Sequence, residues 1–271
     1  MQFARLNDVT LHYQVIGDPA VKPAVVLVNS LGTDFRIWRD VAVKLAGSFA
    51  LLMYDKRGHG LSDVGEAPYS MALHAADLEA LMRHTGFGPA VIAGSSVGGL
   101  IAQQLYLSRP KMIRGMLLLG IAHKVGTHQS WAERIAAVTA GGIEAVADKV
   151  LAGWFTEAFR RDAAAAAGYR NMMTRTPVGG YLGTVAAIRD TDFTAIAPKI
   201  AVPLVVATGE SDPTTPPSLA RELARMVPGA RLEVIRNAAH IPCVEQPDIV
   251  SELIRGLAVL SQTETVSHVR H

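Results

Sequence analysis

The stretch Gly94-Ser95-Ser96-Val97-Gly98 lies between an apolar run at 89–93 and a helix-like stretch at 99–108. This pattern predicts a nucleophile elbow, a sharp turn from a strand into a helix that lifts a serine hydroxyl out of the fold. Side chains two residues before and after the serine would collide across so tight a turn, which explains the glycines. Ser96 is therefore the candidate nucleophile, although a glycine-rich turn without chemistry has the same pattern.

Around this motif, short apolar runs alternate with helical patterns, the rhythm of a mainly parallel sheet with crossover helices. An exposed strand is expected at 9–15, and buried parallel strands are expected at 24–28, 51–54, 90–93, 115–119, 204–207 and 232–235. The covering helices are expected at 37–46, 71–83, 100–108, 219–226 and 249–260, followed by a polar tail at 264–271. The predicted fold class is therefore α/β.

The alternation stops between residues 119 and 204, where four helical patterns follow one another at 128–140, 143–151, 157–167 and 178–188. We predict a core formed by 1–121 and 196–263 and an inserted helical cap at 122–195. Ligands of open α/β sheets bind beyond the carboxyl ends of the strands, so a cap inserted there would cover the Ser96 site. A stabilising appendage away from the site is the alternative.

The composition favours one large domain acting on a small molecule. The chain has 271 residues, 49% of them hydrophobic, and a net charge of only +2 with interspersed signs. Neither nucleic acid nor an anionic membrane surface is therefore an expected partner. The single cysteine, Cys243, excludes an intramolecular disulfide, and the sequence shows neither a secretion signal nor an apolar run of about 20 residues. We expect a cytoplasmic protein.

An activated serine needs a base, and the base needs an orienting acid. His240 follows the expected strand at 232–235, and Asp212 follows the expected strand at 204–207, so both belong to the same sheet edge as Ser96. The order Ser, Asp, His along the chain is that of α/β hydrolases. The fallback partners for His240 are three other acids: Asp55, Asp190 and Asp192.

The remaining histidines have a structural or solvated interpretation. His12 lies in an early strand, His74 and His84 are expected on a helix surface, and His128 lies in the insertion. None has zinc-ligand spacing, and one cysteine cannot build a thiolate site, so no metal is expected.

Acyl transfer also needs two backbone N–H donors for the oxyanion, one from the residue after the serine and one from an earlier strand-to-helix loop. Val97 supplies the first. The loop 29–33 follows the expected strand at 24–28, and Gly32 would let it approach the nucleophile, so the Leu31 amide is the second candidate. An ordinary turn is the alternative for this loop.

Four stretches carry a resemblance that spans nearly the whole chain: 29–34 (NSLGTD), 54–63 (YDKRGHGLSD), 94–103 (GSSVGGLIAQ) and 239–247 (AHIPCVEQP). Together they resemble the 3-oxoadipate enol-lactonases of the α/β-hydrolase superfamily. Stretches 124–127, 130–131 and 153–156 of the insertion are similar to the same family. The departures are Ser95 and Val97, where the family has leucine, and Lys56, where a smaller residue is expected.

The resemblance implies an α/β-hydrolase fold and hydrolysis of 3-oxoadipate enol-lactone to 3-oxoadipate, a step in the breakdown of aromatic compounds. The triad Ser96, His240 and Asp212 would act through an acyl-enzyme without any cofactor. The substrate would be a small lactone that bears a carboxylate, which favours a cationic or polar group in the pocket wall. The oligomeric state stays open.

The insertion offers candidate groups for this carboxylate. Arg134 and Trp131 are three residues apart on one predicted helix face, and Lys124 precedes that helix. Trp154 is a further candidate, although both tryptophans also fit a packing role.

Two kinds of alternative function remain. The same triad serves carboxylesterases, carbon–carbon bond hydrolases and perhydrolases. Some proteins of this fold are small-molecule receptors, and the fold alone does not choose between them.

Overall fold

In the computed structural model, residues 1–268 are described, with side chains through Ser261. Its centre is an eight-stranded sheet with the order β1-β2-β4-β3-β5-β6-β7-β8. The strands are β1 (Gln2–Leu6), β2 (Val9–Ile16), β3 (Ala24–Val28), β4 (Ala50–Tyr54), β5 (Ala90–Ser95), β6 (Ile113–Leu119), β7 (Leu204–Gly209) and β8 (Arg231–Ile235). Only the pairs β1–β2 and β2–β4 are antiparallel. The predicted mainly parallel α/β sheet is confirmed.

The central strands form where apolar residues run without interruption. Every residue of β4, β5 and β7 is buried, as expected for strands covered on both faces. The edge strand β1 was missed by the sequence analysis. Its residues are exposed or half-buried, and it pairs only with β2, so it has no apolar run to reveal it.

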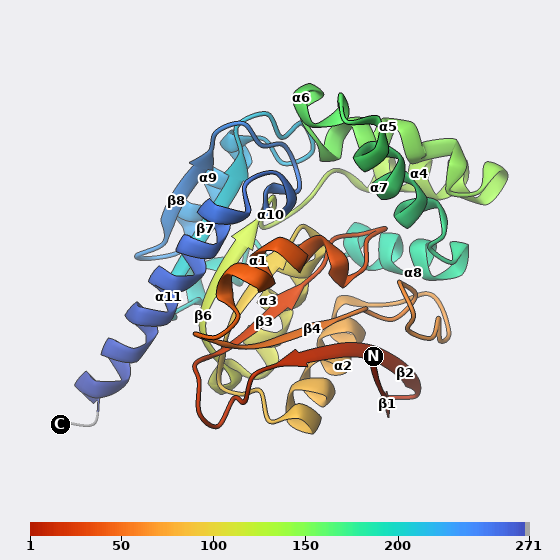
Figure 1. Cartoon of the computed structure of the whole chain (residues 1–271). Helices are drawn as coiled ribbons and strands as arrows, with labels where there is room; N and C mark the ends of the chain where they lie inside the picture. The colour runs from red at the N-terminus through yellow and green to blue at the C-terminus, as the bar shows by residue number, and fades with distance from the viewer. Residues whose placement is uncertain (269–271) are drawn as a thin grey trace.

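Helices cover both faces of the sheet. Helix α1 (Arg39–Leu45) packs against α11 (Pro247–His268) on one face, while α2 (Met71–Thr85) packs against α3 (Val97–Ser108) on the other (Figure 1). Helix α9 (Pro217–Met226) contacts β7 and β8. The ends of α2 have clear chemical causes: the Ser70 hydroxyl accepts from the Leu73 N–H, and Gly86 closes the helix in a left-handed conformation.

Five α-helices and no strand lie between β6 and β7: α4 (His128–Gly141), α5 (Glu144–Trp154), α6 (Glu157–Arg160), α7 (Ala163–Thr174) and α8 (Val178–Arg189). In Figure 1 they lie together beyond one end of the sheet, as a cap. One predicted helix, 157–167, is in fact two. The Asp162 carboxylate accepts hydrogen bonds from the Ala164 and Ala165 N–H groups and so begins α7 as a new helix.

The C-terminal segment is more helical than expected. Helix α11 continues to His268, through most of the predicted polar tail 264–271, and residues 269–271 lie outside the described part of the chain. Within the described residues, no helix is long and apolar enough to cross a membrane.

Candidate active site

The chain makes an elbow at Ser96, between β5 and α3. Ser96 has φ 51° and ψ −119°, a backbone conformation that residues other than glycine rarely adopt. A methyl group at Gly94 would collide with the backbone of Gly98, and one at Gly98 would collide with the carbonyl of Val28. Both glycines are therefore required by close backbone contacts, and the strained turn exposes the Ser96 side chain at the carboxyl edge of the sheet.

His240 and Asp212 meet at the same edge, from the loops after β8 and β7. The imidazole Nδ1 lies 2.8 Å from Asp212 Oδ2, and both side chains are buried. The other carboxylate oxygen accepts from the N–H groups of Thr214 and Thr215. Burial raises the pKa of Asp212, but the imidazole and the hydrogen bonds from Thr215 outweigh it, so that its pKa is lowered overall. Asp212 is thus a stable anion that orients His240.

Gly120 lies directly against this pair. It adopts φ +56° immediately after β6, and a methyl group on it would lie 2.8 Å from the His240 carbonyl oxygen and 3.2 Å from Nδ1. The close packing of the pair therefore depends on a glycine at 120, a residue that the sequence analysis did not single out.

Ser96 and His240 line one cavity of about 220 Å³ between the core and the cap. Its core side is formed by Ser30, Leu31, Ser96, Val97, Leu100, Ile121, Pro213, Thr214 and His240. Its cap side is formed by Val125, Trp131, Arg134, Lys149, Val150, Gly153, Trp154, Tyr181 and Ile188. The cavity brings together residues that lie far apart along the chain, including most of those singled out from the sequence.

The two predicted oxyanion donors, Leu31 and Val97, also line this cavity. In the described part of the chain, neither backbone N–H donates a hydrogen bond to another protein group. The neighbouring Gly32 N–H instead donates to the buried Nε2 of His59 at 3.0 Å. Burial lowers the pKa of His59 well below its usual range, which keeps the imidazole neutral and able to accept. Two N–H groups are therefore available beside Ser96.

The cap contributes a cation to the cavity wall. Arg134 Nη1 donates to the Tyr181 hydroxyl at 3.0 Å, and the guanidinium lies 5.8 Å from the centre of the Trp131 ring. Among the described residues, neither Arg134 nor Lys149 forms an ion pair. Trp154 is almost fully buried and forms part of the same wall. Lys149 and Tyr181 had no signal in the sequence beyond their place in cap helices.

Lys124 does not reach the cavity. Its ammonium lies 3.0 Å from Asp192 Oδ2 at an exposed site, so the structure separates it from the other candidate binding residues. The fallback acids are likewise engaged elsewhere. Asp55 Oδ2 lies 2.8 Å from His12 Nδ1, and Asp190 pairs with Arg189.

The placement of His74 on a helix surface was wrong. Its side chain is buried, and Nε2 lies 3.3 Å from the Thr184 hydroxyl of cap helix α8. Burial lowers its pKa to about 3, so this histidine is neutral. The cap covers that face of α2, and a helical pattern within 71–83 could not reveal this long-range contact.

Glu245, in the short helix α10 (Pro242–Glu245), joins the His240 loop to the cap. One carboxylate oxygen accepts from the Ala239 N–H at 2.7 Å, and the other accepts from the N–H and hydroxyl of Thr156. The Ile241 N–H also donates to the carbonyl of Trp154. The loop that carries the imidazole is therefore held to the cap wall on both sides of His240.

The described residues contain no group of three or more His, Cys, Asp or Glu side chains placed to hold a metal ion. What the site does contain is an imidazole–carboxylate pair, a strained serine and two backbone donors. These are the parts of a nucleophilic acyl-transfer site.

Residues 23–247 match the sequence model of the alpha/beta hydrolase fold family. The chain belongs to this family. As an α/β hydrolase, it has the predicted fold class, including the helical cap.

The chain is also similar to enol-lactonases, as its motifs indicated. It is 29% identical to 3-oxoadipate enol-lactonase 2 of Acinetobacter baylyi over 93% of this chain and 94% of that protein. It is 28% identical to 3-oxoadipate enol-lactonase 1 of the same organism, over 91% and 92%. The crystal structure of the enol-lactonase from Burkholderia xenovorans LB400 superposes with a TM-score of 0.90 at 32% identity, covering 95% of this chain and all of that one. The predicted resemblance is confirmed.

Proposed function

We propose that this α/β hydrolase opens the ring of 3-oxoadipate enol-lactone to give 3-oxoadipate, as part of aromatic-compound breakdown. The observation that carries the proposal is the His240–Asp212 pair and the strained Ser96 around one cavity, whose cap wall holds an arginine that has no acidic partner among the described residues. The likeness to enol-lactonases along nearly the whole chain supports this substrate over other esters.

In the first half-reaction, His240 removes the proton of the Ser96 hydroxyl, and the oxygen attacks the lactone carbonyl. The resulting oxyanion accepts hydrogen bonds from the Leu31 and Val97 N–H groups. Asp212 stabilises the imidazolium that forms. Collapse of the tetrahedral intermediate breaks the ring carbon–oxygen bond, and the His240 imidazolium gives its proton to the departing oxygen, which restores the neutral imidazole. The alcohol part thereby becomes an enol that remains tethered to the acyl group and then tautomerises to a ketone.

In the second half-reaction, His240 activates water, which attacks the acyl-enzyme. The same two N–H groups stabilise the second oxyanion, and the Ser96 oxygen leaves with a proton returned by His240. An enolate is a better leaving group than a simple alkoxide, so ring opening depends less on proton donation than hydrolysis of an alkyl ester does. Deacylation has no such advantage and needs the complete triad.

The Arg134 guanidinium is the proposed site for the substrate carboxylate. Arginine binds carboxylates through paired hydrogen bonds, and Trp131 and Tyr181 hold this guanidinium at the cavity wall. Trp154 provides an apolar wall for the lactone ring. Lys149 adds a second positive charge on the cap side of the cavity.

The experiment that tests the proposal follows the absorbance of freshly prepared enol-lactone with the parent protein and with Ser96→Ala. The parent should turn over many times, and the variant should lose at least about 10³-fold in kcat. Ser95→Ala is the matched control, because the Ser95 hydroxyl is buried in the same turn without a hydrogen-bond partner among the described residues. An unchanged rate in Ser96→Ala would exclude the nucleophile.

Parallel assays separate the alternatives. Turnover of p-nitrophenyl acetate but not of the lactone would indicate a carboxylesterase, and turnover of a vinylogous diketoacid would indicate a carbon–carbon bond hydrolase. A receptor of this fold would hydrolyse its ligand once or very slowly.

A further inference from the structure

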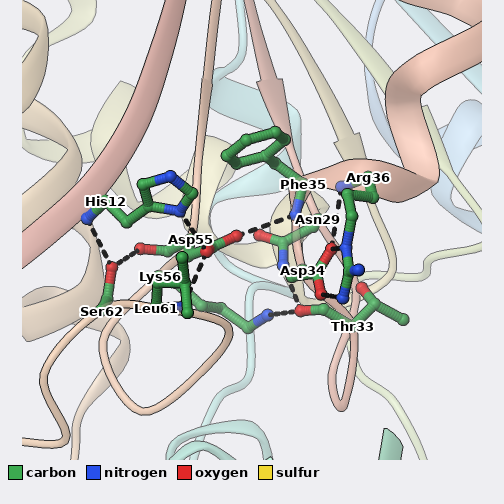
Figure 2. A network of polar contacts seen from close by, with 10 residues as sticks. All are labelled: His12, Asn29, Thr33, Asp34, Phe35, Arg36, Asp55, Lys56, Leu61 and Ser62. Atoms are coloured by element: carbon green, nitrogen blue, oxygen red, sulfur yellow. Dashed lines mark hydrogen bonds and ion pairs between the residues drawn. The ribbon is translucent and has the colours of Figure 1, made fainter. Parts of the chain in front are cut away.

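A buried lysine, Lys56, binds the loop from Asn29 to Asp34, which carries the Leu31 N–H. Lys56 follows β4 and has no solvent-exposed surface. Its ammonium donates to the Ser30 carbonyl at 2.5 Å and approaches the Thr33 carbonyl at 3.4 Å. Figure 2 shows the Lys56 side chain reaching toward Thr33, with Asp55 and its partners to one side.

We propose that Lys56 is a positioning residue for catalysis, which holds the turn 30–33 so that the Leu31 N–H points at the developing oxyanion. The inference rests on the proposed function of the Ser96 site. It assigns a role to a side chain that touches neither the cavity nor the reacting atoms.

The direct contacts of the Lys56 ammonium are with this loop. In the described part of the chain it forms no ion pair, because the neighbouring carboxylates have other partners. Asp34 accepts two hydrogen bonds from the Arg36 guanidinium, and Asp55 accepts from the backbone N–H groups of Phe35 and Leu61 besides contacting His12 (Figure 2). A buried ammonium is costly to desolvate, and burial lowers the pKa of Lys56 to about 7 despite the attraction of Asp55 and Asp34.

The two carbonyls do not need Lys56 to be satisfied. The Ser30 carbonyl also accepts from the Thr33 N–H and the Thr33 hydroxyl, and the Thr33 carbonyl also accepts from the Asn29 side-chain amide. Removing the ammonium therefore leaves neither acceptor without a donor. What it removes is the link from the turn to the end of β4.

His59 provides a separate contact to the turn, where its Nε2 accepts from the Gly32 N–H. Contacts at 30, 32 and 33 thus surround Leu31, whose own N–H stays free of protein acceptors among the described residues. Because a hydrogen-bond donor stabilises an oxyanion only when it is held in place before the reaction, this arrangement favours the transition state rather than substrate binding.

The test compares Lys56→Met, an apolar side chain of similar length, with Lys56→Gln, which keeps a donor. Lys111→Met is the matched control, because Lys111 is an exposed lysine far from the cavity. Rates are measured with p-nitrophenyl acetate as well as with the enol-lactone, and thermal unfolding is followed for each variant. Inhibition by phenylboronic acid, which forms a tetrahedral adduct with serine, reports on the oxyanion site.

In Lys56→Met we expect kcat to fall about 10- to 100-fold with KM within about twofold of the parent, since loss of a whole oxyanion donor costs about 10²- to 10³-fold. The inhibition constant of phenylboronic acid should rise by a similar factor. Lys56→Gln should recover part of both, and Lys111→Met should match the parent.

The proposal is overturned if Lys56→Met keeps its kcat, or if its loss appears in KM alone. If that variant does not fold, Lys56→Leu, which also lacks a donor, takes its place, and a folded Leu variant with parental kcat and boronate affinity would also overturn the proposal. The p-nitrophenyl acetate assay keeps this result separate from the substrate question. A parent enzyme that hydrolyses the ester but not the lactone contradicts the proposed function and leaves the Lys56 comparison intact.

Discussion

The contact between Gly120 and the His240–Asp212 pair makes a sharp prediction for Gly120→Ala. The added methyl group would lie 2.8 Å from the His240 carbonyl oxygen, 3.2 Å from Nδ1 and 3.3 Å from Asp212 Oδ2. Carbon–oxygen contacts in proteins settle at about 3.3–3.6 Å, so the His240 loop must move by about 0.5 Å. Glu245 fixes that loop at Ala239, so the loop cannot shift as a whole. The displacement therefore falls on His240 itself and moves the imidazole.

Two effects of different size follow. The positive φ of residue 120 costs an alanine about 1–2 kcal/mol of stability. A misplacement of 1 Å can cost about 100-fold in rate, so a shift of half that size should reduce kcat/KM about tenfold. The loss of activity comes from geometry at His240, while the loss of stability comes mainly from the backbone.

Gly229→Ala separates these effects, because Gly229 has φ +75° and a methyl group there would meet none of the described atoms within 4 Å. Both variants should unfold at a lower temperature than the parent, but only Gly120→Ala should lose kcat/KM with p-nitrophenyl acetate and with the lactone. Equal kcat/KM values for the two variants would refute the reasoning. The melting temperatures establish that both proteins are folded at the assay temperature.

Two further predictions concern charge. Arg134→Leu should raise KM for the enol-lactone about tenfold and leave kcat/KM for the uncharged p-nitrophenyl acetate within about twofold, because only the lactone carries a carboxylate; an equal loss on both substrates would contradict carboxylate binding. Burial lowers the pKa of Lys56 to about 7 in the folded protein. The unfolded chain therefore holds more protons above that pH, and this group should raise the free energy of unfolding by about 2 kcal/mol between pH 7 and pH 9. Denaturant unfolding of Lys56→Met should lack this rise, and identical pH dependences would exclude a shifted lysine.

Much of the fold could be predicted because its signals are local. The strands β3 to β7 are short and mainly apolar runs, and the elbow at Ser96 has a backbone requirement that only glycine meets on both sides. The edge strand β1 lacks such a run, and the break at Asp162 depends on one side chain that caps α7 rather than extending α6. Local sequence patterns therefore predicted the central strands of the sheet but not its edge strand β1.

The candidate site divides in the same way. Residues that follow strands, such as Ser96, Leu31 and His240, could be assigned to one edge because parallel strands end together. The cap residues could not be ranked, since whether Arg134 or Lys124 faces the cavity depends on how α4 packs against α8 and the core. The burial of Lys56 was also unpredictable, because lysines are almost always exposed in proteins.

The Glu245 carboxylate has a consequence for exchanging caps between α/β hydrolases. Its partners are Thr156 in the inserted helices and Ala239 beside the imidazole, so the two halves of this contact come from distant parts of the gene. A chimera that imports only the helices between β6 and β7 would separate them. Grafts onto this scaffold should therefore transfer residues 156 and 245 as a matched set. Otherwise the loop that carries His240, the proposed general base, loses one of its attachments to the cap.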